Sequence, residues 1–536
     1  KKERFHSRGM YKVRNSTKTK KLIANTGVLY CRMLITMILS FYTTRIVLEA
    51  LGVNDFGLCN VISSVCTMFS FLSGALSSAA SRYYSFYLGQ GEQEKFRQTF
   101  SILLELYCML GGVVLVLSET MGLWIINHKI VISPAQVQAA QIFFQMTVFV
   151  LIVRMLAIPL SGAVIAREDM GIYAALSIFD AAGKLGGVFL LFLASSHRLE
   201  IYGFLQGGLA LLYTGAYGII CCCRYRETRF RFFWSRTLAR EILQFSGWQL
   251  WGATAVMAGT TLVNILLNNY SGVVANAARG IAVQVNGGLS AFTQNFLTAV
   301  NPQIVKSWSG GDVQRFQLLV YQSSKISFFL LWLVACPVLL ELNWILNIWL
   351  KDVPPYTVTF TRLIILSTQI DSFSYPLMIA AGATGRIALY QSVVGGILIM
   401  VFPISWLVFS MGGDASSPMI VGAGCSIVAL FARVTILHRL CSLRISRFLQ
   451  TVVCRALLVG IVSFAAAWCL QLQLQEGWGR LFAVGTLFEA VAILLIWQIG
   501  FAKNERQMLC GMFSESIQRV ISNFGRKFRD RNRLIL

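Results

Sequence analysis

Charged side chains interrupt the long apolar segments of this sequence, and these are the residues best placed to bind a charged ligand. A lysine, arginine or aspartate at the centre of a bilayer costs about 2.5–3.5 kcal/mol, so it usually faces a protein interior or a wet cavity. We take the arginines as candidates for substrate binding: Arg32, Arg45, Arg82, Arg154 and Arg279. Further charged residues within the apolar segments are Asp180, Lys184 and Asp371.

Some of these charges also have a purely structural interpretation. Arg45 and Arg82 lie near the ends of their segments, where a long side chain can reach the lipid headgroups. Asp180 and Lys184 are four residues apart, so they share a helix face and can neutralise each other. The charges hardest to explain in this way are Arg32, Arg154 and Arg279.

Cations outnumber anions among these residues, which favours an anionic ligand. The guanidinium group presents a planar fork of donors that matches two oxygens of a phosphate or pyrophosphate. The sequence contains no phosphate loop, no dinucleotide fingerprint and no pair of histidines at metal-binding spacing. We therefore expect a transporter with no cofactor rather than an enzyme.

Composition places these charges in a membrane. Of 536 residues, 56% are apolar and 13% charged, and the mean hydropathy is +0.65, whereas a soluble domain has about 25% charged residues. The net charge of +23 comes from basic residues that cluster in the tails and in alternate loops. This is the pattern of cytoplasmic membrane faces, so nucleic acid is not an expected partner.

Fourteen segments are long enough to cross a hydrocarbon core of about 30 Å. An even number of crossings puts both basic termini on the cytoplasmic side, as the distribution of positive charge requires. The expected spans lie near 22–49, 57–87, 98–125, 137–163, 171–195, 201–223, 243–269, 273–307, 317–349, 357–382, 387–411, 416–440, 450–471 and 480–501.

The chain contains an internal repeat. A shift of 220 positions places Gly52 on Gly272 and GEQEKF (91–96) on GDVQRF (311–316). A shift of 217 positions continues the match through the second half of each unit. Spans 1–6 therefore pair with spans 7–12, as in parallel repeats related by an axis along the membrane normal.

The repeat divides the chain into two six-helix bundles and an appended pair of helices. In the 217-residue frame Asp371 occupies the position of Arg154, so we expect these opposite charges to meet across the axis and to bias an opening step. The expected segments are a basic cytoplasmic N-terminus (1–21), the bundles 22–223 and 243–441 with a basic linker (224–242) between them, two extra helices (442–501) and a basic cytoplasmic tail (502–536).

Three stretches resemble a known family, the polysaccharide transporter branch of the multidrug/oligosaccharidyl-lipid/polysaccharide exporter superfamily. The resemblance is diffuse and covers roughly residues 20–500. The stretches are NTGVLYCRMLITMILSFYTTRIVLEALGVNDFG (25–57), SSAASRYYSFYLGQGE (77–92) and YPLMIAAGATGRIALYQSVVGGILIMVFPISW (375–406).

The resemblance implies an all-α membrane fold of the MATE type, with two bundles forming a V around a cavity. It implies a flippase that moves an undecaprenyl-diphosphate-linked oligosaccharide from the cytoplasmic to the periplasmic leaflet of the bacterial inner membrane. Related lipid flippases hold the diphosphate with arginines on spans 1, 2 and 8, where this chain has Arg32, Arg82 and Arg279. Proton or sodium coupling is implied as well, and its candidates are Asp180, Lys184 and Asp371.

Two other functions remain open from the sequence. A multidrug cation antiporter would share the fold but would favour a carboxylate-rich cavity. A membrane polysaccharide polymerase or ligase would need a sizeable external loop with catalytic residues, and the expected external loops are short. We further expect a monomer in contact with membrane lipids and with a polysaccharide polymerase as a partner.

Overall fold

The computed structural model describes residues 2–124, 136–193, 197–350, 352–502 and 505–506. Most of the basic tail expected at 502–536 thus lies outside the described residues. The described part of the chain is almost entirely helical and contains no β-strand. The all-α fold expected from the sequence is therefore confirmed.

The first half of the chain begins with one very long helix, α1 (Lys2–Gln90), which covers two of the expected spans and bends between them. It also begins well before the first apolar segment. The helices that follow are α2 (Gln93–Leu117), η1 (Ser118–Gly122), α4 (Val137–Ala166), α5 (Met170–Leu191) and α6 (Arg198–Arg224).

A short turn, η3 (Arg226–Thr228), leads to a second long helix, α7 (Arg236–Ser309), which again covers two expected spans. The remaining helices are α8 (Val313–Leu340), α9 (Leu342–Trp349), α10 (Thr357–Ser372), α11 (Tyr375–Thr384), α12 (Ala388–Ile399), α13 (Val401–Ser410), α14 (Ser417–Cys441), α15 (Ile445–Phe448), η4 (Leu449–Cys454), α16 (Arg455–Gln471), α17 (Trp478–Leu495) and η5 (Ile496–Gly500).

Twelve helical segments in the described residues are long and apolar enough to cross a membrane. The other two expected spans are also helical, as the second halves of α1 and α7, but they are not among these twelve. These two halves carry Arg82 and Arg279. The more polar helix of each repeat thus holds a candidate binding residue.

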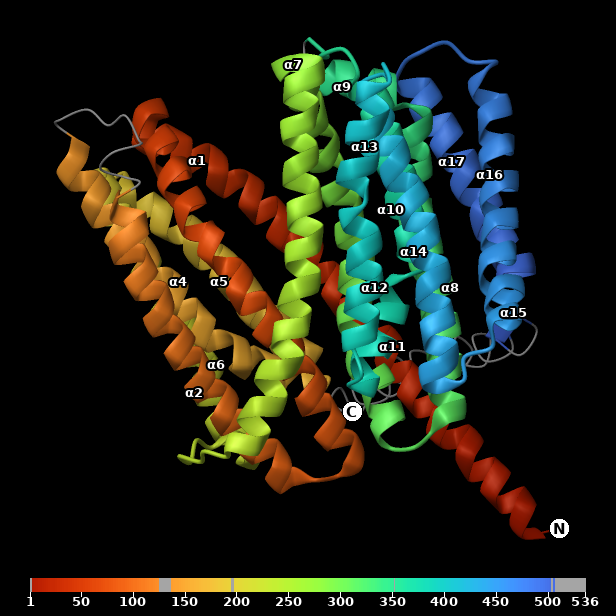
Figure 1. The fold of residues 1–536 in the computed structure, drawn as a ribbon, viewed down its shortest axis with the longest axis horizontal. Helices are drawn as coiled ribbons and strands as arrows, with labels where there is room; N and C mark the ends of the chain where they lie inside the picture. Colours follow the sequence, from red (N-terminus) through yellow and green to blue (C-terminus); the bar gives the residue numbers. More distant parts are fainter. Residues whose placement is uncertain (1, 125–135, 194–196, 351, 503–504, 507–536) are drawn as a thin grey trace, which may run out of the picture.

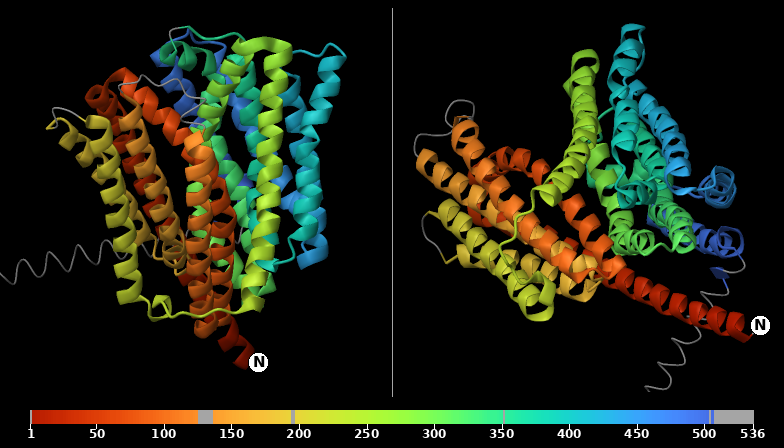
Figure 2. Two further views of the ribbon diagram at one scale, coloured as in Figure 1. Left: turned by 60° about the vertical axis from the view of Figure 1, so that its left-hand side comes forward. Right: turned by 60° about the horizontal axis from the view of Figure 1, so that its bottom comes forward.

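The helices form two lobes, which we define as the N lobe (residues 22–224) and the C lobe (236–441). Figure 1 shows the warm-coloured helices of the N lobe leaning away from the green and cyan C lobe toward the top and approaching it toward the bottom. In the right view of Figure 2 the two lobes also appear as separate groups of helices. We call the side on which the lobes are apart, at the top of Figure 1, the open end, and the side on which they approach each other, at the bottom, the closed end.

Glycines bend the two long helices at equivalent places. Gly52 has φ 78° and ψ 170°, and Gly272 has φ 80° and ψ 178°, a backbone region that only glycine enters without strain. Gly91 and Gly311, which follow α1 and α7, have φ values of 77° and 73°. Both pairs are separated by 220 residues, as the repeat predicts.

Repeat-equivalent residues touch at the closed end. Asn301 Nδ2 donates to Ser81 Oγ at 3.1 Å, and Gly89 lies against Ser309; both pairs are 220 positions apart. Two equivalent residues can meet only near the axis that relates them. The pseudo-twofold axis therefore passes between α1 and α7 at these contacts.

The contact at Gly89 leaves no room for a side chain, which gives a first prediction. A Cβ at Gly89 would lie 2.8 Å from both Cα and O of Lys306, whereas a Cβ at Gly74 on the same helix would meet nothing within 4 Å. We expect Gly89→Ala to push α1 and α7 apart and to raise hydrogen exchange in 81–90 and 301–309 severalfold. Gly74→Ala is the matched control, and equal exchange in both variants would contradict the prediction.

The two appended helices, α16 and α17, pack together and against α8 of the C lobe. Arg480 at the start of α17 donates to Glu341 at 2.8 Å, and both side chains are at least nine-tenths buried. Trp332 of α8 donates its indole N–H to Ser463 of α16 at 3.1 Å. These contacts fix the hairpin on the outer side of the C lobe, away from the interface between the lobes.

Candidate functional site

A cavity of about 410 Å³ lies between the lobes near the closed end. The second half of α1 supplies Ser78 and Arg82, and the C lobe supplies the rest of the wall. None of the described residues that line it is a carboxylate. Its polar lining consists of Ser78, Arg82, Gln249, Gln294, Thr298, Asn301, Tyr375, Tyr390 and Gln391.

Arg82 crosses from the N lobe to the C lobe in this cavity. Its Nε donates to the carbonyl of Gly382 at 2.8 Å. The guanidinium carbon lies 4.4 Å from the ring centroid of Tyr83 and 5.0 Å from that of Phe245, within cation–π range. The side chain therefore points into the protein, so the headgroup interpretation does not describe its position.

Arg32 forms a second bridge between the lobes. Its Nη2 donates to Asn295 Oδ1 on α7 at 2.6 Å, and its Nη1 donates to Ser177 on α5 at 3.4 Å. The guanidinium carbon lies 4.9 Å from the ring centroid of Tyr173. Its Nε is buried and has no hydrogen-bond partner among the described residues.

The N lobe contains a charged cluster of its own. Both guanidinium Nη atoms of Arg154 reach Asp180, the shorter contact being 2.7 Å, and Lys184 Nζ lies 3.0 Å from the same carboxylate. The i,i+4 pair expected on α5 is thus present, and Arg154 joins it from α4. One carboxylate between two cations leaves the cluster with a net positive charge.

Asp371 pairs within the C lobe instead. Its carboxylate lies 3.6 Å from Arg433 Nη1 and accepts from the Ser426 hydroxyl at 3.1 Å, and Arg433 Nε donates to the Tyr390 hydroxyl at 3.2 Å. The expectation that Arg154 and Asp371 meet across the axis is therefore wrong. Each has a closer partner of opposite charge in its own lobe.

Arg279 faces a separate cavity of about 350 Å³ inside the C lobe. Its Nη1 donates to Asn264 Oδ1 and to the carbonyl of Thr260. Among the described residues it has no carboxylate partner. Arg45, by contrast, is exposed on α1, which is consistent with a side chain that reaches headgroups.

Ion pairs join the lobes at the closed end. Glu168, in the turn between α4 and α5, lies 2.7 Å from Lys306 of α7 and 3.6 Å from Lys21 of α1. The next residue, Asp169, accepts from the Tyr225 hydroxyl at 2.5 Å. Burial, together with this hydrogen bond, raises the pKa of Tyr225 above its usual range.

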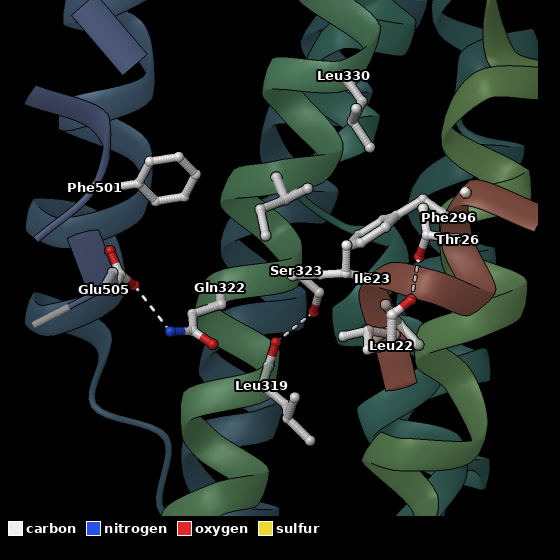
Figure 3. A pocket seen from close by; sticks show the side chains of 13 residues that line it. Leu22, Ile23, Thr26, Phe296, Leu319, Gln322, Ser323, Leu330, Phe501 and Glu505 are labelled. Carbon is white, nitrogen blue, oxygen red and sulfur yellow. Dashed lines mark hydrogen bonds between the residues drawn. The ribbon is translucent and has the colours of Figure 1, made fainter. Parts of the chain in front are cut away.

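A third cavity, of about 380 Å³, is mostly apolar (Figure 3). It lies between the start of the first span, the end of α7, α8 and the residues that follow η5. Figure 3 shows Gln322 donating to Glu505, at 3.2 Å, while Glu505 also pairs with Lys325 at 2.8 Å. Glu505 is thus neutralised, the Thr26 and Ser323 hydroxyls donate to backbone carbonyls, and most of the remaining wall is apolar.

Sequence reasoning missed several of these residues. Glu168 lies between the expected spans 137–163 and 171–195, and Lys306 lies at the end of the expected span 273–307. Their opposite charges were the available signal. Arg433 and Asn295 gave no spacing signal, because their partners are distant in sequence.

Glu489, midway along α17, is half-buried and has no hydrogen-bond or ion-pair partner among the described residues.

Comparison with known proteins adds the fold-level relationship. No family model and no curated protein matches the sequence. The MATE transporter ClbM in complex with Rb⁺ matches with a TM-score of 0.65 and 13% identity over 78% of this chain and 94% of that one. An outward-facing multidrug resistance MATE transporter of the MOP superfamily matches with a TM-score of 0.68 and 12% identity over 80% and 97%.

The chain has the fold of the MATE transporters. A third match, a MOP superfamily transporter from Pyrococcus furiosus, has a TM-score of 0.66 and 12% identity over 80% of this chain and 96% of that chain. For that transporter, the reverse polarity of the binding pocket suggests a different function. At such identities the MATE fold is shared, and the choice of substrate must be argued from the residues of this chain.

Proposed function

We propose that this MATE-fold chain is a flippase for an undecaprenyl-diphosphate-linked oligosaccharide, moving it from the cytoplasmic to the periplasmic leaflet of the bacterial inner membrane. The observation that carries the proposal is the lining of the cavity between the lobes. It offers one arginine, several amides and tyrosines, and no carboxylate among its described residues. An anionic, hydroxyl-rich headgroup finds donors there, whereas an organic cation finds no counter-charge.

Two further features support the same substrate. Arg32 and Arg82 both bridge the lobes and would supply fixed positive charge for a diphosphate, whereas Arg279, in the separate C-lobe cavity, would contact the substrate at another point of its path. The apolar cavity beside the first span offers room for part of a prenyl chain near the same end of the molecule. The N-lobe cluster at Asp180 and Lys184 and the C-lobe pair at Asp371 are the proposed sites of ion coupling.

We propose that transport proceeds by alternating access, in which the contacts at the closed end break. With both termini cytoplasmic, as the charge pattern predicts, the closed end is the inner end and the cavity opens outward. Transport would require Glu168 to separate from Lys306 and Arg82 to leave Gly382. We propose that a single chain carries out this cycle and that a polysaccharide polymerase uses its product.

The test compares two passengers on the same purified protein. In proteoliposomes we expect translocation of a fluorescent polyprenyl-diphosphate oligosaccharide, and no proton-driven efflux of ethidium. The chain should also restore surface polysaccharide in a flippase-deleted strain that makes the matching glycan. Ethidium efflux without lipid translocation would instead establish the multidrug antiporter.

A further inference from the structure

The linker between the lobes displays three aromatic side chains away from the protein. Residues 230–235 connect η3 to α7 without helix or strand, and Arg229 and Ser235, at the two ends of this connection, have extended backbone angles. Phe230, Phe232 and Trp234 are 53%, 78% and 45% exposed, whereas Phe233 is partly buried. An exposed aromatic row of this kind marks an interaction surface.

This display is held in place by hydrogen bonds on the other side of the segment. The backbone N–H of Phe233 donates to Glu105 of α2 at 3.4 Å, and the Phe233 ring packs against the N-lobe core. Arg229 Nε donates to the carbonyl of Cys222 at 3.3 Å. These contacts fix the linker on the N lobe and leave its aromatic row facing outward.

The depth of the segment indicates what covers it. Glu105 is well inside α2, about 18 Å from its start at 1.5 Å per residue, so Phe233 lies beside a membrane-spanning helix rather than beyond its end. α6 ends at Arg224 and α7 begins at Arg236 on this side. Figure 2 shows the segment running along the lower edge of the N lobe. Tryptophan concentrates at this interface depth, and phenylalanine is apolar enough to enter the adjoining hydrocarbon.

Arginines alternate with the aromatic residues. Arg229, Arg231 and Arg236 are exposed, and no carboxylate lies within ion-pair distance of them in the described part of the chain. Guanidinium groups at a membrane surface attract anionic phospholipid headgroups. The occupant that satisfies both the apolar row and the unpaired cations is an anionic phospholipid.

We infer that residues 229–236 are an anionic phospholipid-binding surface that anchors the N lobe in the leaflet at the closed end. Phe230, Phe232 and Trp234 would lie among the upper acyl chains, and the arginines would hold the phosphates. This inference does not depend on the transported substrate. It holds equally for a lipid flippase and for a drug exporter.

Photo-crosslinking tests the aromatic side. The full chain, with p-benzoylphenylalanine in place of Phe232, is placed in nanodiscs of phosphatidylcholine and phosphatidylglycerol and irradiated. We expect mass spectrometry to find phospholipid adducts on the peptide that contains residue 232. The same label in place of Phe100, which is 1% exposed in the N-lobe core, should give adducts within the protein only. Protein adducts, or no lipid adducts, at 232 would overturn the inference.

Lipid retention tests the charged side. We expect Arg229→Gln with Arg231→Gln to lower the retained phosphatidylglycerol-to-phosphatidylcholine ratio by roughly tenfold in native mass spectrometry. The control is Lys95→Gln with Arg97→Gln, because these cations already pair with Glu92 and Glu94 at 2.8 and 2.7 Å. An unchanged ratio in a monodisperse double variant, or an equal loss in the control, would refute phospholipid selectivity.

Discussion

Arg82→Ala is expected to abolish export by this chain. The side chain is the only cation among the described residues that line the cavity between the lobes, and its loss removes the charge that offsets desolvation of a diphosphate. Hydrogen bonds to charged groups contribute about 1.5–3 kcal/mol each, so two lost contacts to phosphate correspond to a loss of at least about 100-fold in affinity. Complementation of a flippase-deleted strain and lipid binding to purified protein measure the two effects.

Arg82→Lys separates charge from geometry. Lysine keeps the positive charge but lacks the planar fork and the contact from Nε to Gly382, so we expect partial export and intermediate affinity. Arg97→Ala, on the surface of α2, is the control for loss of an arginine as such. Normal lipid affinity in a folded Arg82→Ala protein would remove this residue from the substrate site.

Glu168→Gln is expected to open the closed end. Glu168 and Lys306 are mostly buried, with side-chain exposures of 11% and 25%, and removing one partner of such a pair costs about 3 kcal/mol. A change of this size shifts a two-state equilibrium by about 100-fold. Double electron–electron resonance measures the distance between spin labels placed on the two lobes in a cysteine-free background. At the closed end we expect the longer distances of a state that is open there.

The charge-reversed pair supplies the decisive control for this prediction. Glu168→Lys combined with Lys306→Glu restores the attraction and should return the distance distribution toward that of the unmodified protein. Lys21→Gln should have little effect, because Lys21 is half exposed and lies 3.6 Å from Glu168, and exposed pairs contribute about 0–1 kcal/mol. If Glu168→Gln leaves the distances unchanged, other contacts hold this end closed.

The helices and the repeat were accessible from sequence because they depend on local composition and on backbone conformation. Apolar runs predicted twelve spans that the structure contains, and the shift of 220 residues aligned Gly52 with Gly272, the two positions at which the long helices bend. The pairing of Asp180 with Lys184 was likewise accessible, since both lie on one helix face.

Partners on different helices were not accessible. Helix packing brings Arg154 to Asp180 and Arg433 to Asp371, and nothing in the spacing of these residues along the chain encodes that choice. The Arg154–Asp371 prediction failed for this reason, because equivalence in a repeat does not imply contact. Only residues close to the axis meet their equivalents, and Arg154 and Asp371 lie within separate lobes.

The contacts between Ser81 and Asn301 and between Gly89 and Ser309 have a consequence for how the chain can change. They form the intramolecular counterpart of a self-complementary dimer interface, in which each position faces its own copy. In such an interface between two identical halves, one substitution would alter both sides of the contact at once. In this chain the two halves have separate sequences, so each side of the contact can change independently. The contacts accordingly pair different residues, serine with asparagine and glycine with serine.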